Sequence, residues 1–448
     1  MYKRSAIYIS PVRVLALSFL LIILVGTVLL SLPAASADGR SMGLTDALFT
    51  ATSAVCVTGL VVVDTGTQLT LFGQVTLICL IQIGALGLMT MSTLIFFLLG
   101  KKITLRERLI MQEALNQYKL EGVVRLTKYI LVVTFLIEGA GALLLAVRFI
   151  PLFGWGTGIY YSVFHSISAF CNAGFDLMGY YSGLTEFTGD YIINLVIMGL
   201  ITLGGLGFTV ILDLNSYGFH PRKWSLHTRI VIIMSLVLIF GGALFFLLVE
   251  CNNSDTMARL SFDQKVLAAF FQSVSSRTAG MNTINLAGLT SASKFMTILL
   301  MFIGASPAST GGGIKTTTFS LILLMAWSVV KGRRDIVVFR KCIPHSVALR
   351  ALAIALFSLL ALIVVTMALS LMEFVPFIDI LFQTASALGT VGLASMDTGG
   401  MQDISKIILS LTMFMGRVGP LSLTLAFARR QSRSVNDIRY PEERILVG

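Results

Sequence analysis

The sequence predicts an all-α integral membrane protein in which a helix, a re-entrant loop and a second helix are repeated four times. The composition is the first reason, because 56% of the residues are hydrophobic, only 12% are charged and the mean hydropathy is +0.88. The second reason is four long apolar runs at residues 14–32, 130–147, 230–249 and 351–371, whose only charged residue is Glu138. Each run can cross a hydrocarbon core of roughly 30 Å at 1.5 Å per residue. This composition excludes a soluble chain.

The third reason is a motif that occurs four times, in which a Phe is followed ten residues later by a Gly. The copies are FTATSAVCVTG (49–59), FHSISAFCNAG (164–174), FFQSVSSRTAG (270–280) and FQTASALGTVG (382–392). Their glycines are 115, 106 and 112 residues apart, and each copy lies between two apolar stretches. Four such loops can converge on one axis, so the pattern predicts a pseudo-fourfold central pore.

The basic residues predict the topology. Residues 1–13, 101–128, 220–229, 331–350 and 429–448 hold three, seven, three, six and five Lys or Arg, which is 24 of the 33. By the positive-inside rule, this distribution predicts eight spans with both termini in the cytoplasm. The net charge of +11 then reflects orientation and contact with anionic membrane lipid, and no nucleic acid is expected.

The expected organisation is repeat 1 at 1–100, repeat 2 with its preceding cytoplasmic connection at 101–219, repeat 3 at 220–330, repeat 4 at 331–428 and a cytoplasmic tail at 429–448. The N-terminus also has the features of a signal peptide, with Lys3, Arg4, an apolar run and residues 34–37 of sequence AASA. A membrane span is the preferred interpretation, since cleavage would leave the first repeat incomplete.

A short helix is expected before each motif Gly. Ser261 and Gln264 have the spacing of a capping box, and Asp46 and Asp379 lie where the first turn of such a helix would be. The opposite end of each helix dipole, with roughly −0.5 charge, would then point to the pore centre and favour a dehydrated cation.

After each short helix, three residues ending in the motif Gly are expected to run extended and to form a selectivity filter. Their backbone carbonyls can replace the hydration shell of an ion, and Thr390, Val391 and Gly392 match the core of the potassium-channel filter. No carboxylate lies in any copy, which excludes an Asp/Glu ring, and K⁺ is the first candidate ion. The filter residues are Val57, Thr58, Gly59, Asn172, Ala173, Gly174, Thr278, Ala279, Gly280, Thr390, Val391 and Gly392.

Small residues also recur in the second helix of each repeat. The sequences GALG (84–87), GGLG (204–207), GASP (304–307) and GRVG (416–419) begin 24 to 30 residues after their motif glycines. Close helix packing is one explanation, and a bend or a pore-lining position is the other.

The stretch 295–330 is too long for one span, at about 54 Å if it were a straight helix. Its centre is rich in Gly, Ser and Pro, so a loop is expected to interrupt this helix beneath the filter, where irregular backbone lines a cavity. A phosphate-binding P-loop is excluded because Ile314 separates Gly313 from Lys315 and the segment lies within a span.

Arg417 is placed in mid-span, where a charge needs partners. Loop carbonyls are the expected acceptors, either in a static bridge or, as we prefer, in a gate. The gate residues are Ala305, Ser306, Ala308, Ser309, Thr310, Gly311, Gly312, Gly313, Lys315 and Arg417.

These motifs closely resemble the Trk/Ktr/HKT superfamily of K⁺ transporters, specifically the membrane subunit of bacterial Ktr systems (KtrB/KtrD type). The resemblance covers nearly the whole chain, including IQIGALGLMT (81–90), KKITLRERLIMQEALNQ (101–117) and MGRVGPLSL (415–423). It departs at Ala85, where relatives often carry Gly. The resemblance implies a homodimer in the bacterial cytoplasmic membrane, with one pore in each subunit. It also implies a cytosolic ring of nucleotide-binding KTN/RCK subunits, so that ATP or ADP acts only through the partner, and K⁺ uptake with Na⁺ as an activator.

Two other functions compete with a channel-like pore. A K⁺ symporter coupled to Na⁺ or H⁺ would suit broken helices, but such carriers typically have inverted repeats, whereas these repeats share one orientation. An enzyme is not expected, because no Asp pair or Ser/His pair occurs at membrane depth. The five scattered cysteines and four histidines support neither disulfides nor a zinc site.

Overall fold

The computed structural model describes residues 11–87, 123–218, 220–333 and 335–419, and in these ranges the protein is mostly helical, with 14 α-helices. This confirms the predicted all-α class. Most of the basic connection at 101–128, together with Lys3, Arg4 and the tail at 429–448, lies outside the described residues.

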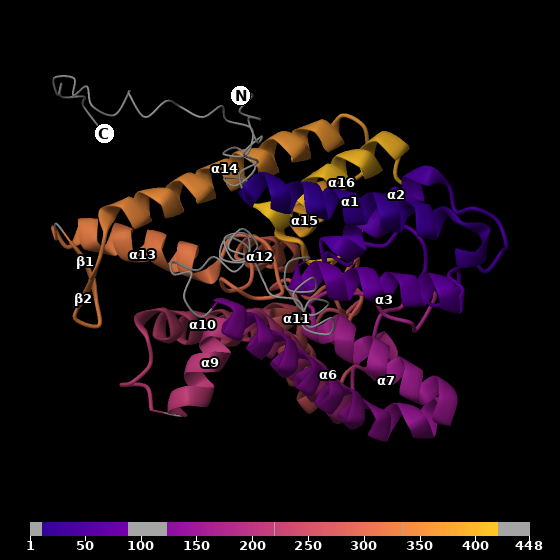
Figure 1. Cartoon of the computed structure of the whole chain (residues 1–448), viewed down its shortest axis with the longest axis horizontal. Coiled ribbons are helices and arrows are strands. Elements are labelled where there is room, and N and C mark those ends of the chain that lie inside the picture. Colours follow the sequence, from indigo (N-terminus) through magenta and orange to yellow (C-terminus); the bar gives the residue numbers. More distant parts are fainter. Residues whose placement is uncertain (1–10, 88–122, 219, 334, 420–448) are drawn as a thin grey trace, which may run out of the picture.

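The elements follow one order along the chain (Figure 1). An outer helix, a short helix and an inner helix follow one another four times. The long outer helices are α1 (Pro11–Ser31), α6 (Val123–Phe153), α10 (Leu226–Glu250) and α14 (His345–Ser370). Short helices follow them: α2 (Leu44–Val55), α7 (Trp155–Phe170), α11 (Phe262–Ser275) and α15 (Phe377–Gly389). Inner helices come last: α3 (Leu71–Leu86), α8 (Tyr191–Leu206), α12 (Ser291–Phe302) and α16 (Asp403–Val418).

Two helices extend the inner set. The helix α9 (Phe208–Tyr217) continues from α8 after a bend of 99° at Gly207. The helix α13 (Thr316–Val330) continues from α12 after residues 303–315, which we call the interrupting loop. The predicted interruption of the third inner helix is therefore present. Two 3₁₀ turns, Pro33–Ala35 and Thr185–Phe187, complete the helical elements of the described residues.

Four of the described helices are long and apolar enough to cross a membrane, namely the four outer helices. The count is five if the bent pair α8 and α9 forms one span. The helices α3, α12, α13 and α15 are apolar but shorter, with 10–17 residues.

Local sequence fixes where the short and inner helices begin. The predicted capping box of Ser261 and Gln264 is present at α11, and Asp46 and Asp379 lie in the first turns of α2 and α15, as expected. Three inner helices begin at side chains that accept backbone N–H groups: Thr70, Asp190 and Thr290.

The motif phenylalanines anchor the short helices in the core. Phe49, Phe164 and Phe382 are at most 1% exposed. In the third copy the fully buried ring is that of Phe271, whereas Phe270 is only partly buried, so the third motif begins one residue later than predicted. Because Phe270 and Phe271 are adjacent, the sequence alone did not reveal this shift. The interval between the buried Phe and the motif glycine Gly280 is therefore one residue shorter than in the other three copies.

A β-hairpin joins α13 to α14. Its strands β1 (Ile336–Val338) and β2 (Lys341–Ile343) are antiparallel, with Ile336 opposite Ile343. Figure 1 shows the hairpin and α9 at the same end of the molecule as the end of α13. This is the end where the basic segments 220–229 and 331–350 lie.

Candidate functional site

The four triplets predicted to form the filter meet in a closed ring formed by one chain. A Cβ atom added to each motif glycine would strike the carbonyl oxygen of the residue that precedes the next motif glycine. The distances would be 2.4 Å from Gly59 to Ala173, 2.9 Å from Gly174 to Ala279, 2.3 Å from Gly280 to Val391 and 2.2 Å from Gly392 to Thr58. The last contact returns to the first triplet, so the four segments surround one axis.

All four triplets share one backbone conformation, which differs from the predicted one. Each motif glycine has a positive φ, between 74° and 99°. The first residue of each triplet is also left-handed, with φ of 57° at Val57, 59° at Asn172, 73° at Thr278 and 50° at Thr390. The expectation of fully extended triplets is therefore wrong at these four residues. An alternation of left- and right-handed residues turns successive carbonyls to one side, as a carbonyl-lined filter requires.

A buried serine in each short helix holds its triplet from behind. In the first and fourth copies the Oγ atoms of Ser53 and Ser386 accept hydrogen bonds from the motif glycine N–H, at 3.1 and 3.0 Å. In the second and third copies Ser168 and Ser275 donate to the carbonyl that follows the motif glycine. The sequence analysis assigned no role to these serines, although three of the motifs carry Ser at their fifth position.

The small residues of the inner helices have two separate tasks. The first glycine allows close packing, since a Cβ at Gly84, Gly204 or Gly416 would lie 2.0 to 2.1 Å from a carbonyl at the end of the short helix in the same repeat. The last glycine ends the helix with a positive φ, at Gly87, Gly207 and Gly419. Close packing is therefore confirmed for the first glycine, and a bend is present at Gly207, where α8 and α9 meet at 99°. GASP departs from this pattern, because the left-handed residue there is Ala308.

Polar pairs connect each inner helix to the short helix of the next repeat, near the starts of both helices. Two of the pairs are salt bridges that use the predicted first-turn aspartates. The pairs are Gln74 with Tyr160 (3.0 Å), Tyr191 with Asp263, Lys294 with Asp379 (2.7 Å) and Lys406 with Asp46 (2.8 Å). These contacts run around the ring in the same order as the filter contacts.

The interrupting loop lies directly against the first residues of two filter triplets. A Cβ at Gly311 would lie 2.2 Å from Thr278 Oγ1, and one at Gly312 would lie 2.2 Å from Thr390 Oγ1. The loop is fixed mainly to the second repeat. Thr310 Oγ1 donates to the carbonyls of Phe170 and Gly204, both at 3.1 Å.

Further bonds hold other residues that the sequence predicts to form a gate. The Ser306 N–H donates to the Gly205 carbonyl at 3.0 Å, and the Ala308 carbonyl accepts from the N–H of Phe208, the first residue of α9, at 2.8 Å. Within the loop, Ser309 Oγ donates to the Ser306 carbonyl at 2.6 Å, and the Ala305 carbonyl accepts from Thr316 N–H at 3.3 Å. Lys315 Nζ donates to the Gly311 carbonyl at 2.7 Å.

Arg417 forms the predicted hydrogen bond to a loop carbonyl. Its Nη1 donates to Thr310, and its Nη2 donates to Gly84 and Ala85 at 2.6 and 3.1 Å. The second pair of acceptors was missed by the sequence analysis. They are free because α3 ends at Leu86, which leaves its last carbonyls without helical partners. Arg417 thus joins the interrupting loop to the first inner helix.

Two buried charged side chains beside the ring were not assigned from sequence. Gln82 Nε2 donates to both carboxylate oxygens of Glu138, at 3.1 and 3.2 Å, and the Cys171 thiol lies 3.7 Å from this carboxylate, directly before the second triplet. Arg277 precedes the third triplet and is 8% exposed, and its Nε has no partner among the described residues.

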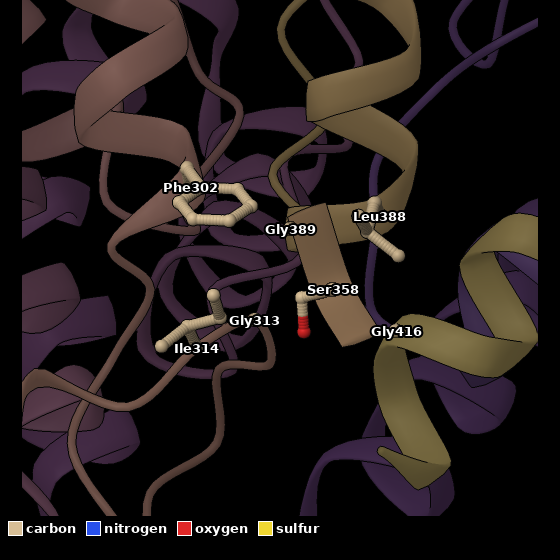
Figure 2. Close-up of a pocket in the computed structure, with 7 residues that line it drawn as sticks. All are labelled: Phe302, Gly313, Ile314, Ser358, Leu388, Gly389 and Gly416. Atoms are coloured by element: carbon tan, nitrogen blue, oxygen red, sulfur yellow. The ribbon is translucent and has the colours of Figure 1, made fainter. Parts of the chain in front are cut away.

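A small cavity lies between the interrupting loop and the fourth repeat (Figure 2). It has a volume of about 10 Å³, enough for about one water molecule. Figure 2 shows Gly313 and Ile314 of the loop on one side, Leu388 and Gly389 of α15 on the other and Ser358 of α14 between them. This is little free space for a loop that would have to move.

Comparisons with known proteins show the family of this chain. A family model described as "Cation transport protein" (TrkH) matches residues 16–437. The Ktr system potassium uptake protein B of Bacillus subtilis is 42% identical over 98% of this chain and 97% of that protein. The potassium/sodium uptake protein NtpJ of Enterococcus hirae is 39% identical over 100% and 99%.

The crystal structure of the potassium transporter TrkH from Vibrio parahaemolyticus shares the fold. Its TM-score is 0.74 at 20% identity, over 96% of this chain and 86% of that one. The family match and the identity to the curated relatives together decide the assignment: this chain belongs to the TrkH family of cation transport proteins.

Proposed function

We propose that this chain takes up K⁺ across the bacterial cytoplasmic membrane through a channel-like pore whose filter consists of backbone carbonyls. The observation that carries the proposal is the closed ring of contacts among Gly59, Gly174, Gly280 and Gly392. The carbonyl ends of the four short helices meet at this ring, so their dipoles favour a dehydrated cation there. Relatives that match nearly the whole chain are named as potassium uptake proteins.

The interrupting loop is the proposed gate. It touches the triplets at Thr278 and Thr390, and the guanidinium of Arg417 holds it through Thr310. A segment rich in Gly and Ser buries little side-chain area, so moving it would chiefly break the hydrogen bonds of Thr310, Lys315 and Arg417. Selectivity and gating would then reside in different groups, the carbonyls of the triplets and the loop with Arg417.

The proposed architecture has four repeats and eight spans around one pore, with both termini in the cytoplasm. The repeat boundaries are 1–100, 101–219, 220–330 and 331–428, with a tail at 429–448. The common order of outer, short and inner helices supports the repeats, and the basic segments at one end support the orientation.

The proposed assembly is a homodimer bound to a cytosolic ring of KTN/RCK-type subunits that carries the nucleotide site. The relatives named as parts of a Ktr system support a partner subunit. Na⁺ is proposed as an activator, and the name of the Enterococcus hirae relative includes sodium.

The test is ⁸⁶Rb⁺ and K⁺ uptake by a cell that lacks its own K⁺ uptake systems, with and without a KTN-type subunit. We expect uptake driven by membrane potential, with an increase when the subunit is present. A turnover typical of a carrier, together with strict stoichiometric coupling to Na⁺ or H⁺, would favour an alternating-access symporter instead. Absence of K⁺-dependent growth and uptake with either subunit combination would reject the proposal.

A further inference from the structure

A pocket of about 330 Å³ lies at the start of α10, apart from the filter and the interrupting loop. It is formed by the connection between α9 and α10, the first two turns of α10 and the turn of the β-hairpin. Its lining combines two arginines with aromatic and apolar side chains: Pro221, Arg222, Trp224, Arg229, Ile232, Ile233 and Phe339.

The pocket carries a net positive charge. None of its lining residues is acidic, and neither Arg222 nor Arg229 forms an ion pair within the described parts of the chain. The nearby Asp213 of α9 accepts hydrogen bonds from Ser225 N–H and Thr228 Oγ1, at 3.2 and 2.6 Å. This carboxylate therefore holds the elbow between the two helices, and it forms no ion pair with either arginine among the described residues.

The guanidinium of Arg229 is held in place but retains free donors. Its Nη2 donates to the Arg222 carbonyl at 2.5 Å, and its carbon lies 5.8 Å from the centre of the Phe339 ring. Its Nε is buried and has no hydrogen-bond partner among the described residues, so this atom does not face the pocket. Its Nη1 forms no hydrogen bond among the described residues, so a phosphate would be bound through the edge that Nη1 and Nη2 form, which can offer two parallel hydrogen bonds.

The hairpin places Phe339 at the pocket at a conformational cost. Phe339 and Arg340 form the two-residue turn between β1 and β2, and both have positive φ, of 50° and 62°. Turns of this kind favour Asn and Gly, and a bulky residue in the left-handed region is strained. Its ring is 47% exposed, so burial in the protein core does not explain why Phe occupies this position.

The apolar side of the pocket continues as a stripe along α10. Ile233 lies one turn after Arg229, and exposed apolar side chains follow on the same face: Leu236, Val237, Phe240 and Leu244. From Arg229 to Leu244 the helix rises about 22 Å, comparable to an acyl chain. Trp224, whose Nε1 donates to the Gly218 carbonyl at 2.9 Å, lies at the polar end, where Trp is enriched at membrane interfaces.

We propose that this pocket binds an anionic glycerophospholipid, with the headgroup phosphate at Arg222 and Arg229 and one acyl chain along α10. A soluble phosphorylated partner would not use the apolar stripe, which faces away from the protein. A zwitterionic lipid offers the same phosphate but adds a cation that the arginines repel. The proposal requires that α10 cross the membrane, and it does not depend on which ion is transported.

The test uses the full chain reconstituted in phosphatidylcholine vesicles and reports on Trp224. Replacing the other two tryptophans, W155F and W327F, makes Trp224 the sole indole fluorophore. Phosphatidylglycerol or phosphatidylcholine, each brominated near the headgroup end of its chains, is then added at increasing mole fraction. We expect phosphatidylglycerol to quench Trp224 at lower mole fraction, with a preference of about fivefold for each arginine contact.

Variants distinguish lipid binding in the pocket from a general attraction of anionic lipid to the positively charged surface. Arg222→Gln and Arg229→Gln should each lower the preference by about fivefold, and the double variant should abolish it. Lys223→Gln removes the same charge from the same connection but from a residue that does not line the pocket, so it should retain the preference.

A matched protein that keeps only Trp155 controls for folding and insertion, because this exposed residue belongs to the short helix α7 and should be quenched equally by both lipids. Equal quenching of Trp224 by the two lipids would overturn the proposal. A loss in Lys223→Gln as large as in Arg229→Gln would also overturn it, since general surface charge would then suffice.

Discussion

Replacing Gly392 by Ser tests the filter most directly. This glycine has the largest positive φ of the four motif glycines, 99°, and its missing Cβ would lie 2.2 Å from the Thr58 carbonyl oxygen. Ordinary contact begins at about 3.4 Å, so the Thr58 carbonyl or the Gly392 backbone would have to move by roughly 1 Å. Such a shift changes the position of a proposed ion ligand without touching any charged group.

The size of the effect follows from two costs. A side chain held in a left-handed conformation costs about 1–3 kcal/mol, and the contact with Thr58 adds to this. If the ring relaxes by displacing the carbonyl, a loss of about 1.4 kcal/mol in differential binding lowers the preference for K⁺ over Na⁺ tenfold. We therefore expect Gly392→Ser to reduce this preference by at least about tenfold.

The assay is ⁸⁶Rb⁺ uptake in competition with Na⁺ and K⁺, using reconstituted protein. Gly199→Ser is the matched control, because Gly199 lies in α8 with no atom within 4 Å of its missing Cβ, and it should behave as wild type. The same substitution at Gly59, Gly174 and Gly280 should also weaken selectivity. Wild-type ion preference in all four variants would refute the filter assignment.

Three further predictions concern the loop, the inter-repeat contacts and the entrance. Arg417→Gln removes charge-assisted hydrogen bonds worth about 1.5–3 kcal/mol each, so flux without the partner subunit should rise at least about tenfold while the ion preference stays unchanged. A deletion within residues 305–313 should have the same effect on flux and on ion preference. Lys294→Met leaves the carboxylate of Asp379 buried and unpaired, which should destabilise the protein by about 3–5 kcal/mol and lower its melting temperature in detergent. Asp176 follows the motif glycine Gly174 by two residues, on the side from which ions would enter the proposed filter. Burial raises the pKa of Asp176 to about 6, so uptake at low K⁺ concentration should fall as pH is lowered from 7 to 5 and this carboxylate is neutralised, and Asp176→Asn should remove the dependence.

Each of these predictions has its own control. Unchanged flux after both changes to the gate would reduce the interrupting loop to a structural kink. The double variant of Lys294→Met with Asp379→Asn should recover part of the lost stability, and a double variant as unstable as the single one would contradict the electrostatic explanation. An equally steep pH response in Asp176→Asn would place the titrating group elsewhere.

The sequence predicted which segments form the ring, but it did not predict which of these segments contact one another. The motif glycines, the short helices and the interruption near Thr310 all follow from local patterns, because glycine, capping residues and span length act over a few residues. Which triplet touches which is not local. The salt bridge between Lys406 and Asp46 joins residues 360 positions apart, and no spacing rule connects them.

The backbone conformation of the triplets and the exact end of α3 also could not be predicted from the sequence. The left-handed conformation of Val57 and Thr390 arises from packing against neighbouring segments, since β-branched residues avoid positive φ on their own. The carbonyls of Gly84 and Ala85 became visible as partners of Arg417 only when the end of α3 was known. Both features depend on how elements meet, which composition and periodicity do not specify.

Because one chain closes the ring, its four quadrants need not be alike. The first positions of the triplets hold Val57, Asn172, Thr278 and Thr390, and within the described residues only the third inner helix carries an interrupting loop. A tetramer of identical subunits would bring four such loops to the same axis, where each already lies against two triplets. Covalent linkage of the quadrants therefore makes a single asymmetric obstruction compatible with a nearly fourfold ring, and a residue can be changed in one quadrant without the same change in the other three.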